Sequence, residues 1–440
     1  MSENKHFLID EGGQPFFWLA DTAWELFHRC TLSETEFYLE NRRQKGFNVI
    51  QAVALAELDG LQVPNTDGET PLLENDPSRP NEAYFQHIDA VFKMAANKGI
   101  YIALLPTWGD KVFKMTWGAG PEIFDTNNAY AYGKWIGTRY KDATNILWVN
   151  GGDRPEPADD VSYAPIWRAL ASGVKAGAGD SAFMTYHPNG GHGSAEIFHA
   201  DDWLNMNMWQ SGHSMLDQPN WEMITNDYVR MPIKPVLDGE PNYEDHAINP
   251  FTRKWDPSMG YFRDYDVRKQ AYRAVFAGAC GHTYGHHSVW QMYTQDREPI
   301  NYPDRPWQDA LDRPGAYQVG YLRRLMESRP YLKRIPDQGL LLSGEGEGAC
   351  HIQATRANDG SYAMIYTPAG WDELTINLES LSGTRIQAWW FDPREGTARS
   401  ADKHDRNKSL TFSPPSPHDD WVLVLDDEDF DFSNPAQINS

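Results

Sequence analysis

The chain has 440 residues, 17 of them Trp and 21 Tyr, and a formal net charge of -23 at pH 7. This length exceeds what one hydrophobic core usually serves, so we expect a large domain and a smaller one. The negative charge argues against nucleic acid and anionic membranes as partners, whereas flat aromatic side chains are typical of carbohydrate binding. We therefore expect a carbohydrate ligand.

The first residues lack the apolar core of a secretory signal, and no stretch approaches the roughly 20 apolar residues that span a bilayer. We expect a cytoplasmic protein, or a secreted or periplasmic one if a signal has been removed. Cys30, Cys280 and Cys350 are far apart in the chain. They predict buried free thiols, because their spacing fits neither a disulfide framework nor a metal finger.

Apolar runs alternate with amphipathic stretches over the first three quarters of the chain, a rhythm typical of βα units. Each run ends in polar or aromatic residues. The eight runs predict strands within 16–24, 49–55, 101–108, 146–153, 183–188, 203–210, 234–241 and 282–290.

The stretches between the runs predict helices. Residues 33–46 predict a helix with a capping box formed by Ser33 and Glu36 and an end at Gly46, and residues 81–99 predict another that ends at Gly99. Eight such units favour a (β/α)8 TIM barrel. The alternative is a doubly wound open sheet, which would require a glycine-rich phosphate loop after the first strand, and the sequence there has none.

The composition changes between Pro330 and Pro336, where the helical pattern stops and short strand-like runs begin. The runs lie within 349–357, 361–369, 373–378, 385–392 and 421–427, and they predict a small antiparallel β-sandwich. We thus expect a catalytic barrel over 1–335 and a sandwich domain over 336–440 that ends in an acidic, partly loose tail.

Two carboxylates follow predicted strands, where active sites of TIM barrels lie. Asp153 follows Gly151 and Gly152 at the end of the fourth run, and Glu240 follows Gly239 at the end of the seventh. Two carboxyl groups suffice to cleave a glycosidic bond, so no metal or cofactor is expected. A separation of about 5–5.5 Å would specify retention of configuration, and about 6.5–9.5 Å inversion.

A single carboxylate after a strand more often caps a helix or forms an ion pair, but two at glycine-flanked strand ends favour catalysis. Asp238, Glu244 and Asp245 are the competing candidates, and Asp238 could exchange roles with Glu240 or support it. Further side chains at the ends of the runs could bind sugar hydroxyls or stack on sugar rings. These candidate substrate-binding residues are Asp21, Trp24, Gln51, Trp108, Asn150, His187, Asn207, Trp209, Gln210, His286 and Trp290.

The histidines His282, His286 and His287 could instead indicate a metal site. Barrel metallohydrolases usually carry a His-x-His pair on the first strand, where this chain has Asp21 and Trp24. The cluster is better explained by hydroxyl binding or packing.

The segments FFWLADTAWELFHR (16–29), WVNGGDRPE (148–156) and KPVLDGEPNYE (234–244) closely resemble the apiosidase-like glycoside hydrolases, glycoside hydrolase family 140 and its relatives. The segment RIQAWWFDPREGTA (385–398) resembles the C-terminal β-domain of that family, which is named for collagen binding. The resemblance covers nearly the whole chain. It implies a (β/α)8 barrel followed by this β-domain.

The resemblance also implies a retaining exo-hydrolase with Asp153 as acid/base and Glu240 as nucleophile. Its substrate would be a plant-derived oligosaccharide or glycoside that carries a terminal apiose-like sugar or another pentose or hexose. A pectin-degrading member would ordinarily be exported, so the lack of a signal favours small substrates. Two alternatives remain: a non-catalytic carbohydrate-binding or adhesion protein, and a metal-dependent barrel hydrolase.

Overall fold

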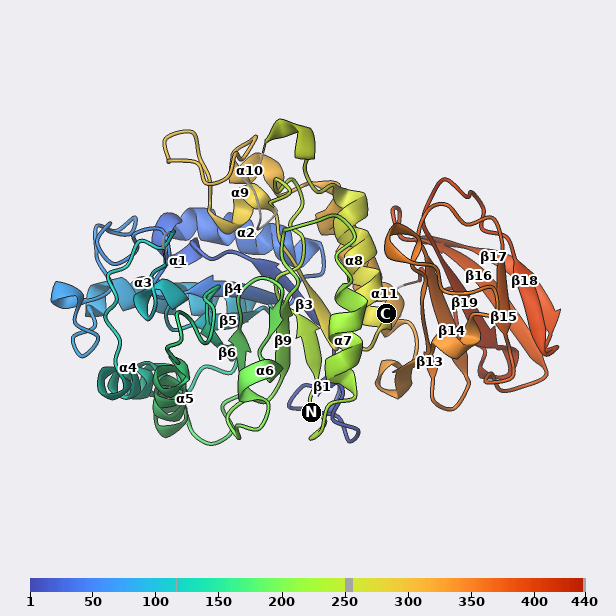
Figure 1. Ribbon diagram of the computed structural model, residues 1–440, viewed down its shortest axis with the longest axis horizontal. Coiled ribbons are helices and arrows are strands. Elements are labelled where there is room, and N and C mark those ends of the chain that lie inside the picture. The colour runs from blue at the N-terminus through green and yellow to red at the C-terminus, as the bar shows by residue number, and fades with distance from the viewer. Residues whose placement is uncertain (116, 250–255, 438–440) are drawn as a thin grey trace.

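The computed structural model describes residues 1–115, 117–249 and 256–437 (Figure 1). The N-terminal part holds eight parallel strands in chain order: β3 (Trp18–Thr22), β4 (Val49–Val53), β5 (Tyr101–Leu105), β6 (Ile146–Gly151), β7 (Met184–His187), β9 (Asn207–Gln210), β10 (Val236–Asp238) and β11 (Gly281–Tyr284). Each lies within one of the eight predicted runs, apart from the first residue of β11. The short strands β1 (Leu8–Ile9), β2 (Pro15–Phe16) and β8 (His192–Gly193) are antiparallel additions.

Ladder hydrogen bonds join β11-β3-β4-β5-β6-β7 into one sheet and β9-β10 into another. Two further backbone bonds close the ring: the amide of Asn205 donates to the carbonyl of Met184 (2.8 Å), and that of Cys280 to the carbonyl of Val236 (2.9 Å). A closed ring leaves no edge strand exposed. The predicted (β/α)8 barrel is confirmed.

Helices follow the strands and cover the barrel. They are α1 (Leu26–Arg29), α2 (Leu32–Gln44), α3 (Glu82–Asn97), α4 (Thr126–Arg139), α5 (Ala164–Ala178), α6 (Ala195–Phe198), α7 (Asn220–Tyr228), α8 (Asp264–Phe276), α9 (His287–Trp290), α10 (Trp307–Ala310) and α11 (Pro314–Glu327). The predicted end of α3 at Gly99, with φ +68°, is confirmed.

The predicted capping box of α2 is wrong. Thr31, not Ser33, is the N-cap, and its side chain accepts a hydrogen bond from the amide of Glu34, whose carboxylate in turn accepts one from the amide of Thr31. Ser33 lies inside the first turn, where its backbone is already helical and cannot form the cap.

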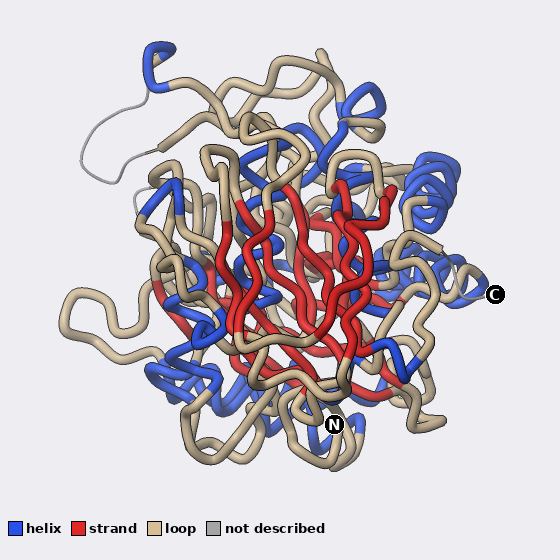
Figure 2. Tube along the Cα trace, turned by 90° about the vertical axis from the view of Figure 1, so that its right-hand side faces the viewer, coloured by secondary structure: helices blue, strands red, loops and turns tan. Residues whose placement is uncertain are grey.

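The C-terminal domain is an antiparallel sandwich, as predicted. Its larger sheet has the order β12 (Arg334–Pro336), β13 (Gln353–Ala357), β14 (Tyr362–Thr367), β19 (Trp421–Asp427), β16 (Arg385–Asp392) and β17 (Thr397–Asp405). The smaller pairs β15 (Leu374–Asn377) with β18 (Ser409–Phe412). Viewed from its own side of the molecule, the strands of this domain lie side by side in front of the barrel (Figure 2).

Helix α8 joins the two domains, lying between the barrel and the larger sheet (Figure 1). Tyr272 stacks on Tyr366 with ring centroids 5.0 Å apart, and both belong to one apolar cluster that also includes Val275 and Val424. The domains therefore share a core.

One sequence prediction outside the barrel needs correction. Cys350 is exposed, whereas Cys30 and Cys280 are buried free thiols. The described part of the acidic tail packs against the sandwich domain, because the ring of Phe432 lies 6.4 Å from that of Tyr362 on β14; residues 438–440 lie outside the described residues. None of the helices in the described part of the chain is both long and apolar enough to cross a membrane.

Candidate active site

A cavity of about 900 Å³ opens at the carboxyl ends of the barrel strands. The strand ends and the loops that follow them form its wall. The lining residues are Trp24, Glu57, Leu58, Trp108, Met115, Trp117, Asp153, Pro155, Asn189, Gly190, Gln210, Gly212, His213, Ser214, Glu240, Tyr243, His246, Asn249, Trp290, Ile300 and Asn301. Both predicted catalytic carboxylates are among them.

Asp153 reaches the cavity through a turn that two glycines make possible. Gly151, Gly152 and Asp153 have φ values of +91°, +126° and +48°. A Cβ on Gly152 would lie 2.7 Å from the amide nitrogen of Gly109 and 2.9 Å from the ring of Trp108, so only glycine fits there. Arg154 Nη1 donates to the Asp153 carbonyl at 2.7 Å and holds the turn.

The environment of Asp153 favours its neutral form. Burial raises its pKa above the ordinary value, and the negative charge of Glu240 raises it further. Arg154, His187 and a hydrogen bond from Gln210 oppose this shift without reversing it. Asp153 thus has the character of a general acid.

The backbone around Glu240 is fixed on three sides. The amide of Gly239 donates to the carbonyl of Trp209 (2.7 Å), and Gln51 Nε2 donates to the carbonyl of Gly239 (3.0 Å). The carbonyl of Glu240 itself accepts from the amide of Gly212 at 2.9 Å. These bonds anchor the end of β10 to its neighbours and leave the carboxylate facing the cavity.

Two histidines hold the Glu240 carboxylate. His213 Nε2 donates to Oε1 at 3.0 Å, and His187 Nε2 lies 2.9 Å from Oε2. Burial alone would raise the pKa of Glu240, but these two imidazoles outweigh it and lower the pKa to about 2. Glu240 is therefore charged where Asp153 is neutral, which is the pairing that an acid and a nucleophile require.

The three competing carboxylates form hydrogen bonds or ion pairs with other residues of the protein. Asp238 accepts hydrogen bonds from the Ser211 hydroxyl (2.8 Å) and the Asn220 amide (3.0 Å), and it does not line the cavity. Glu244 accepts from the Tyr284 hydroxyl at 2.6 Å, and Asp245 is paired with arginines, including Arg313 at 2.8 Å. Of the carboxylates near the end of β10, Glu240 is the one that faces the cavity.

Four predicted substrate-binding residues line the cavity: Trp24, Trp108, Gln210 and Trp290. The rings of Trp24 and Trp108 lie 5.0 Å apart, and both contact the ring of His187. The predicted residues Gln51 and His187 act on the site through Gly239 and Glu240, as described above.

Asn150 is buried at the end of β6, and its amide oxygen and nitrogen form no hydrogen bond with the described residues. The structure does not place it in the cavity wall. A buried amide has four hydrogen-bonding positions to satisfy, so this side chain is available to water or a ligand hydroxyl.

Four predicted substrate-binding residues do not line the cavity and have partners within the protein. Asp21 accepts from Tyr38 (2.6 Å) and Arg42 (2.5 Å) inside the barrel wall. The amide oxygen of Asn207 lies 3.1 Å from His199 Nδ1. The two others are Trp209, whose indole donates to Asp227 (2.8 Å), and His286, whose Nε2 lies 3.3 Å from Asp245.

The sequence pattern does not predict several of the lining residues, because these residues lie on loops beyond the strand ends. Glu57 follows β4, Trp117 follows β5, and His213 follows β9. A signal existed for His213, since it lies three residues after Gln210, the end of a predicted strand. Nothing in the sequence around Glu57 or Trp117 marks either of them as part of the site.

The neighbouring histidines that could have indicated a metal site bind different partners. His286 contacts Asp245, whereas His287 Nε2 donates to the Asn301 carbonyl at 2.9 Å. Across residues 1–115, 117–249 and 256–437, no three His, Cys, Asp or Glu side chains are grouped so that they could hold a metal ion.

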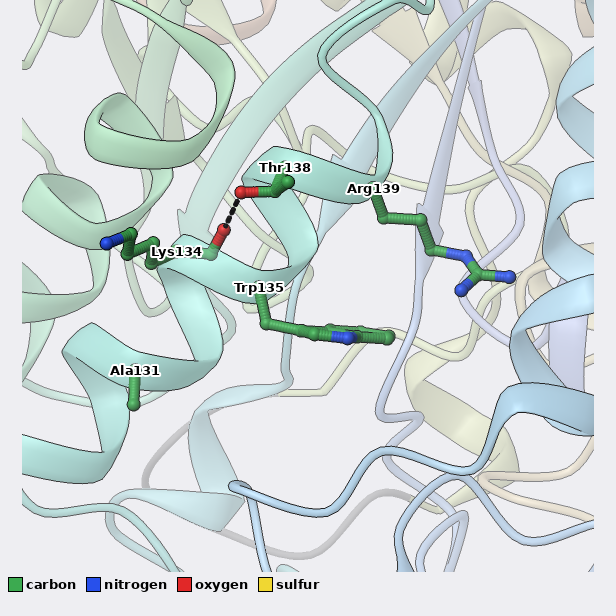
Figure 3. A pocket seen from close by; sticks show the side chains of 5 residues that line it. All are labelled: Ala131, Lys134, Trp135, Thr138 and Arg139. Carbon is green, nitrogen blue, oxygen red and sulfur yellow. Dashed lines mark hydrogen bonds between the residues drawn. The ribbon is translucent and has the colours of Figure 1, made fainter.

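A second pocket, of about 440 Å³, lies on α4 (Figure 3). Its lining carries no carboxyl, thiol or imidazole group: Ala131, Lys134, Trp135, Thr138 and Arg139. Arg139 forms ion pairs with Glu82 (2.8 Å) and Asp89 (2.7 Å). This pocket therefore lacks the pair of carboxyl groups that glycoside cleavage requires.

The family model described as "Apiosidase-like, catalytic domain" matches residues 2–333, which is most of the chain. The chain belongs to the apiosidase-like family. A second model, "Putative collagen-binding domain of a collagenase", matches residues 335–426. The resemblance noted in the sequence is thus confirmed for both parts of this apiosidase-like protein. A search of the curated proteins finds no match.

Solved structures resemble the apiosidase-like chain over its full length. One, titled a glycoside hydrolase family 5 protein from Bacteroides vulgatus, is 32% identical, with a TM-score of 0.90 over 99% of this chain and 94% of its own. Another, titled "Glycoside hydrolase", is 33% identical, with a TM-score of 0.88 over 98% and 97%. Family and neighbours together support glycosidase activity.

A family 39 glycoside hydrolase from the gut symbiont Bacteroides cellulosilyticus is 10% identical, with a TM-score of 0.52 over 92% of this chain and 80% of its own. At this identity the likeness concerns the fold alone.

Proposed function

We propose that the protein is a retaining exo-glycosidase that removes a terminal sugar from a plant-derived oligosaccharide or glycoside. The observation that carries the proposal is the pairing in one cavity of a half-buried carboxyl whose neutral form is favoured, Asp153, with a carboxylate held charged by two histidines, Glu240. A glycosidase needs both forms at once.

In the first step, Asp153 donates its proton to the glycosidic oxygen while a Glu240 oxygen attacks the anomeric carbon. The glycosidic bond breaks, the leaving group departs as an alcohol, and the sugar remains bound to Glu240 as an ester. In the second step, the Asp153 carboxylate takes a proton from water as the water oxygen attacks the anomeric carbon. Glu240 leaves as a carboxylate, and both groups return to their starting forms.

Exo-action is supported by the loops that surround the cavity. Residues 57–58, 115, 117, 212–214 and 300–301 all contribute to its wall, so loops rise around the ends of several barrel strands. Trp24, Trp108 and Trp290 supply apolar faces for the terminal sugar. The family match supports an apiose-like sugar or another pentose or hexose at that position.

The test is hydrolysis of a panel of 4-nitrophenyl glycosides, pentofuranosides included, by the wild type and the Glu240→Gln variant. We expect Glu240→Gln to lose at least about 10³-fold in kcat with its fold intact, because the nucleophile is gone. The surface variant Glu196→Gln serves as control, since Glu196 pairs with His192 outside the cavity. Activity that survives a strong chelator would exclude the metal-dependent alternative.

A loss of less than about tenfold in Glu240→Gln would contradict the assignment of the nucleophile. Sugar binding without turnover, unchanged in Glu240→Gln, would instead support the non-catalytic carbohydrate-binding alternative.

A further inference from the structure

We propose that the Asp153 side of the cavity is a subsite for a sugar leaving group, with Trp117 as its stacking platform and Glu57 as its hydroxyl-binding group. This inference rests on the proposed function, because it assigns the leaving group to the side of the proton donor. It names two residues that the catalytic steps do not use, and it makes the leaving group a sugar.

The two sides of the cavity differ in chemistry. The glycosidic oxygen must lie within hydrogen-bond reach of Asp153 to receive its proton, so the unit that leaves lies beside the neighbours of Asp153. On the opposite side, imidazoles surround Glu240: the ring of His213 stacks on that of His246 with centroids 4.2 Å apart. We therefore place the sugar that leaves on the Asp153 side of the cavity.

Trp117 is suited to stack on a sugar ring. Its side chain lines the cavity, yet 58% of the residue is exposed, which is unusual for such a large apolar group. The guanidinium carbon of Arg154 lies 5.5 Å from its ring centroid, so one part of the indole is held by a buried cation. The exposed remainder is an apolar surface against which sugar C–H groups can pack.

Glu57 supplies hydrogen-bonding groups next to this surface. Its side chain lines the cavity and is 14% exposed, and Arg154 Nη2 lies 3.6 Å from Oε1, too far for a hydrogen bond. No hydrogen bond to its carboxyl is formed by the described residues. Burial raises the pKa of Glu57 to about 8, with Arg154 opposing the shift and Asp110 and Asp153 adding to it.

A neutral carboxyl offers one O–H donor and at least one acceptor, which matches the hydroxyl groups of a sugar. The contact of Glu57 with Arg154 at 3.6 Å is too long for a hydrogen bond, so a sugar hydroxyl can supply one. A 4-nitrophenyl leaving group could stack on Trp117 but has no hydroxyl groups for Glu57. A comparison of a sugar leaving group with a 4-nitrophenyl leaving group therefore distinguishes the role of Glu57 from that of Trp117.

Arg154 connects this subsite to the acid. It is 3% exposed, donates to the Asp153 carbonyl at 2.7 Å, and contacts both Trp117 and Glu57. We treat it as a positioning residue. It is not used as a test variant, because its loss would disturb Asp153 as well.

The experiment uses two substrates that share one glycone: its 4-nitrophenyl glycoside and its glycoside with a methyl hexopyranoside. We expect Glu57→Ala to lower kcat/KM for the second substrate about 10- to 100-fold and to change the first by less than about threefold. Trp117→Ala should lower kcat/KM for both, and more for the sugar. Glu57→Gln should retain most of the wild-type activity, because an amide also offers a donor and an acceptor.

A matched control is Trp135→Ala, which removes a tryptophan from the pocket of Figure 3. It should leave both substrates unchanged. Equal losses on both substrates in Glu57→Ala, or no loss on either, would overturn the inference. If Glu57→Gln fails as badly as Glu57→Ala, the carboxyl acts as an anion and the neutral-donor role is wrong.

A second measurement needs no turnover, so it tests the subsite even if the proposed function fails. Saturation-transfer NMR with methyl hexopyranosides should detect binding to the wild type and to Trp135→Ala, with a loss of signal in Trp117→Ala. Binding that is equal in Trp117→Ala and the wild type would overturn the subsite. An absence of hydrolysis on every glycoside, with this binding intact, would contradict the proposed function alone.

Discussion

Asp153 is half-buried and Glu240 is buried in the same cavity, and their immediate neighbours drive the two carboxyl groups to opposite forms. Glu240 has two imidazoles within 3.0 Å of its oxygens. Asp153 is exposed to the charge of Glu240 itself, and its contact with Arg154 is long, with Nη1 at 3.5 Å from Oδ2. The proposed roles of Asp153 and Glu240 thus rest on the placement of His187, His213 and Arg154.

The turn that presents Asp153 leads to a prediction about Gly152. Gly152→Ala should destabilise the fold by about 1–3 kcal/mol, because its Cβ would meet the backbone of Gly109 and the ring of Trp108 at a left-handed φ. Gly191→Ala is the control, since Gly191 also has a positive φ but no atom within 4 Å of the position that a Cβ would take. Urea denaturation of both variants measures the difference; equal effects would contradict the steric account.

His213 leads to a prediction about pH. Glu240 must be charged, so kcat/KM falls as the pH drops through its pKa of about 2, and Asp153 must be protonated, so kcat/KM falls as the pH rises through its raised pKa. His213→Ala removes one hydrogen bond to Glu240 and should shift the acid limb to higher pH. The surface variant His192→Ala should leave the profile unchanged. An acid limb that stays in place in His213→Ala would count against this role.

At the scale of elements, α8 carries the contact between the domains. Arg268 on α8 forms two hydrogen bonds of 2.8 Å with Asp420, and both side chains are buried. Asp420→Ala should lower the free energy of unfolding by about 3–5 kcal/mol, because it leaves a buried guanidinium without this partner.

The matched control is Glu327→Ala, which breaks the partly exposed i,i+4 pair with Arg323 on α11. It should change stability by less than about 0.5 kcal/mol. Chemical denaturation of the two variants tests the contrast, and similar values would show that burial does not decide the strength of these pairs.

Elements with a strong apolar pattern could be predicted, and those without one could not. The eight barrel strands are buried along almost their whole length and read as continuous apolar runs. β17 (TARSADKHD) was missed because it is a polar, largely exposed edge strand that pairs only with β16 among the described strands. Charged and polar side chains on an edge discourage unwanted pairing, and they also remove the signal by which a strand is predicted.

The residues of the candidate site also fall into a group that the sequence predicts and a group that it does not. Asp153 and Glu240 stand directly after strands and were predicted, whereas Glu57, Trp117 and His246 reach the cavity from loops whose paths depend on the whole barrel. Asp21 and His286 belong to strand ends too, but a buried arginine and a buried aspartate, respectively, bind them instead. The position of a residue after a predicted strand indicates at which end of the barrel its side chain lies. It does not indicate which other side chain will bind it.

At the scale of the whole molecule, the shared core predicts joint unfolding. Arg273 donates to the carbonyls of Gly348, Ala349 and His351, and Arg329 is paired with Asp426, so contacts with the sandwich extend well beyond Arg268. We expect one calorimetric transition, with a calorimetric enthalpy equal to the van't Hoff enthalpy. Two resolved transitions would mean that the domains unfold independently.

The most direct test of the account is azide rescue of the Glu240→Ala variant on an activated aryl glycoside. The account predicts that azide occupies the space of the missing carboxylate and attacks the anomeric carbon, so that NMR detects a glycosyl azide of inverted anomeric configuration. Asp153→Ala should give a glycosyl azide of retained configuration, because there azide intercepts the ester on Glu240. Rescue of Glu240→Ala that yields no glycosyl azide, or one of retained configuration, would contradict Glu240 as the nucleophile.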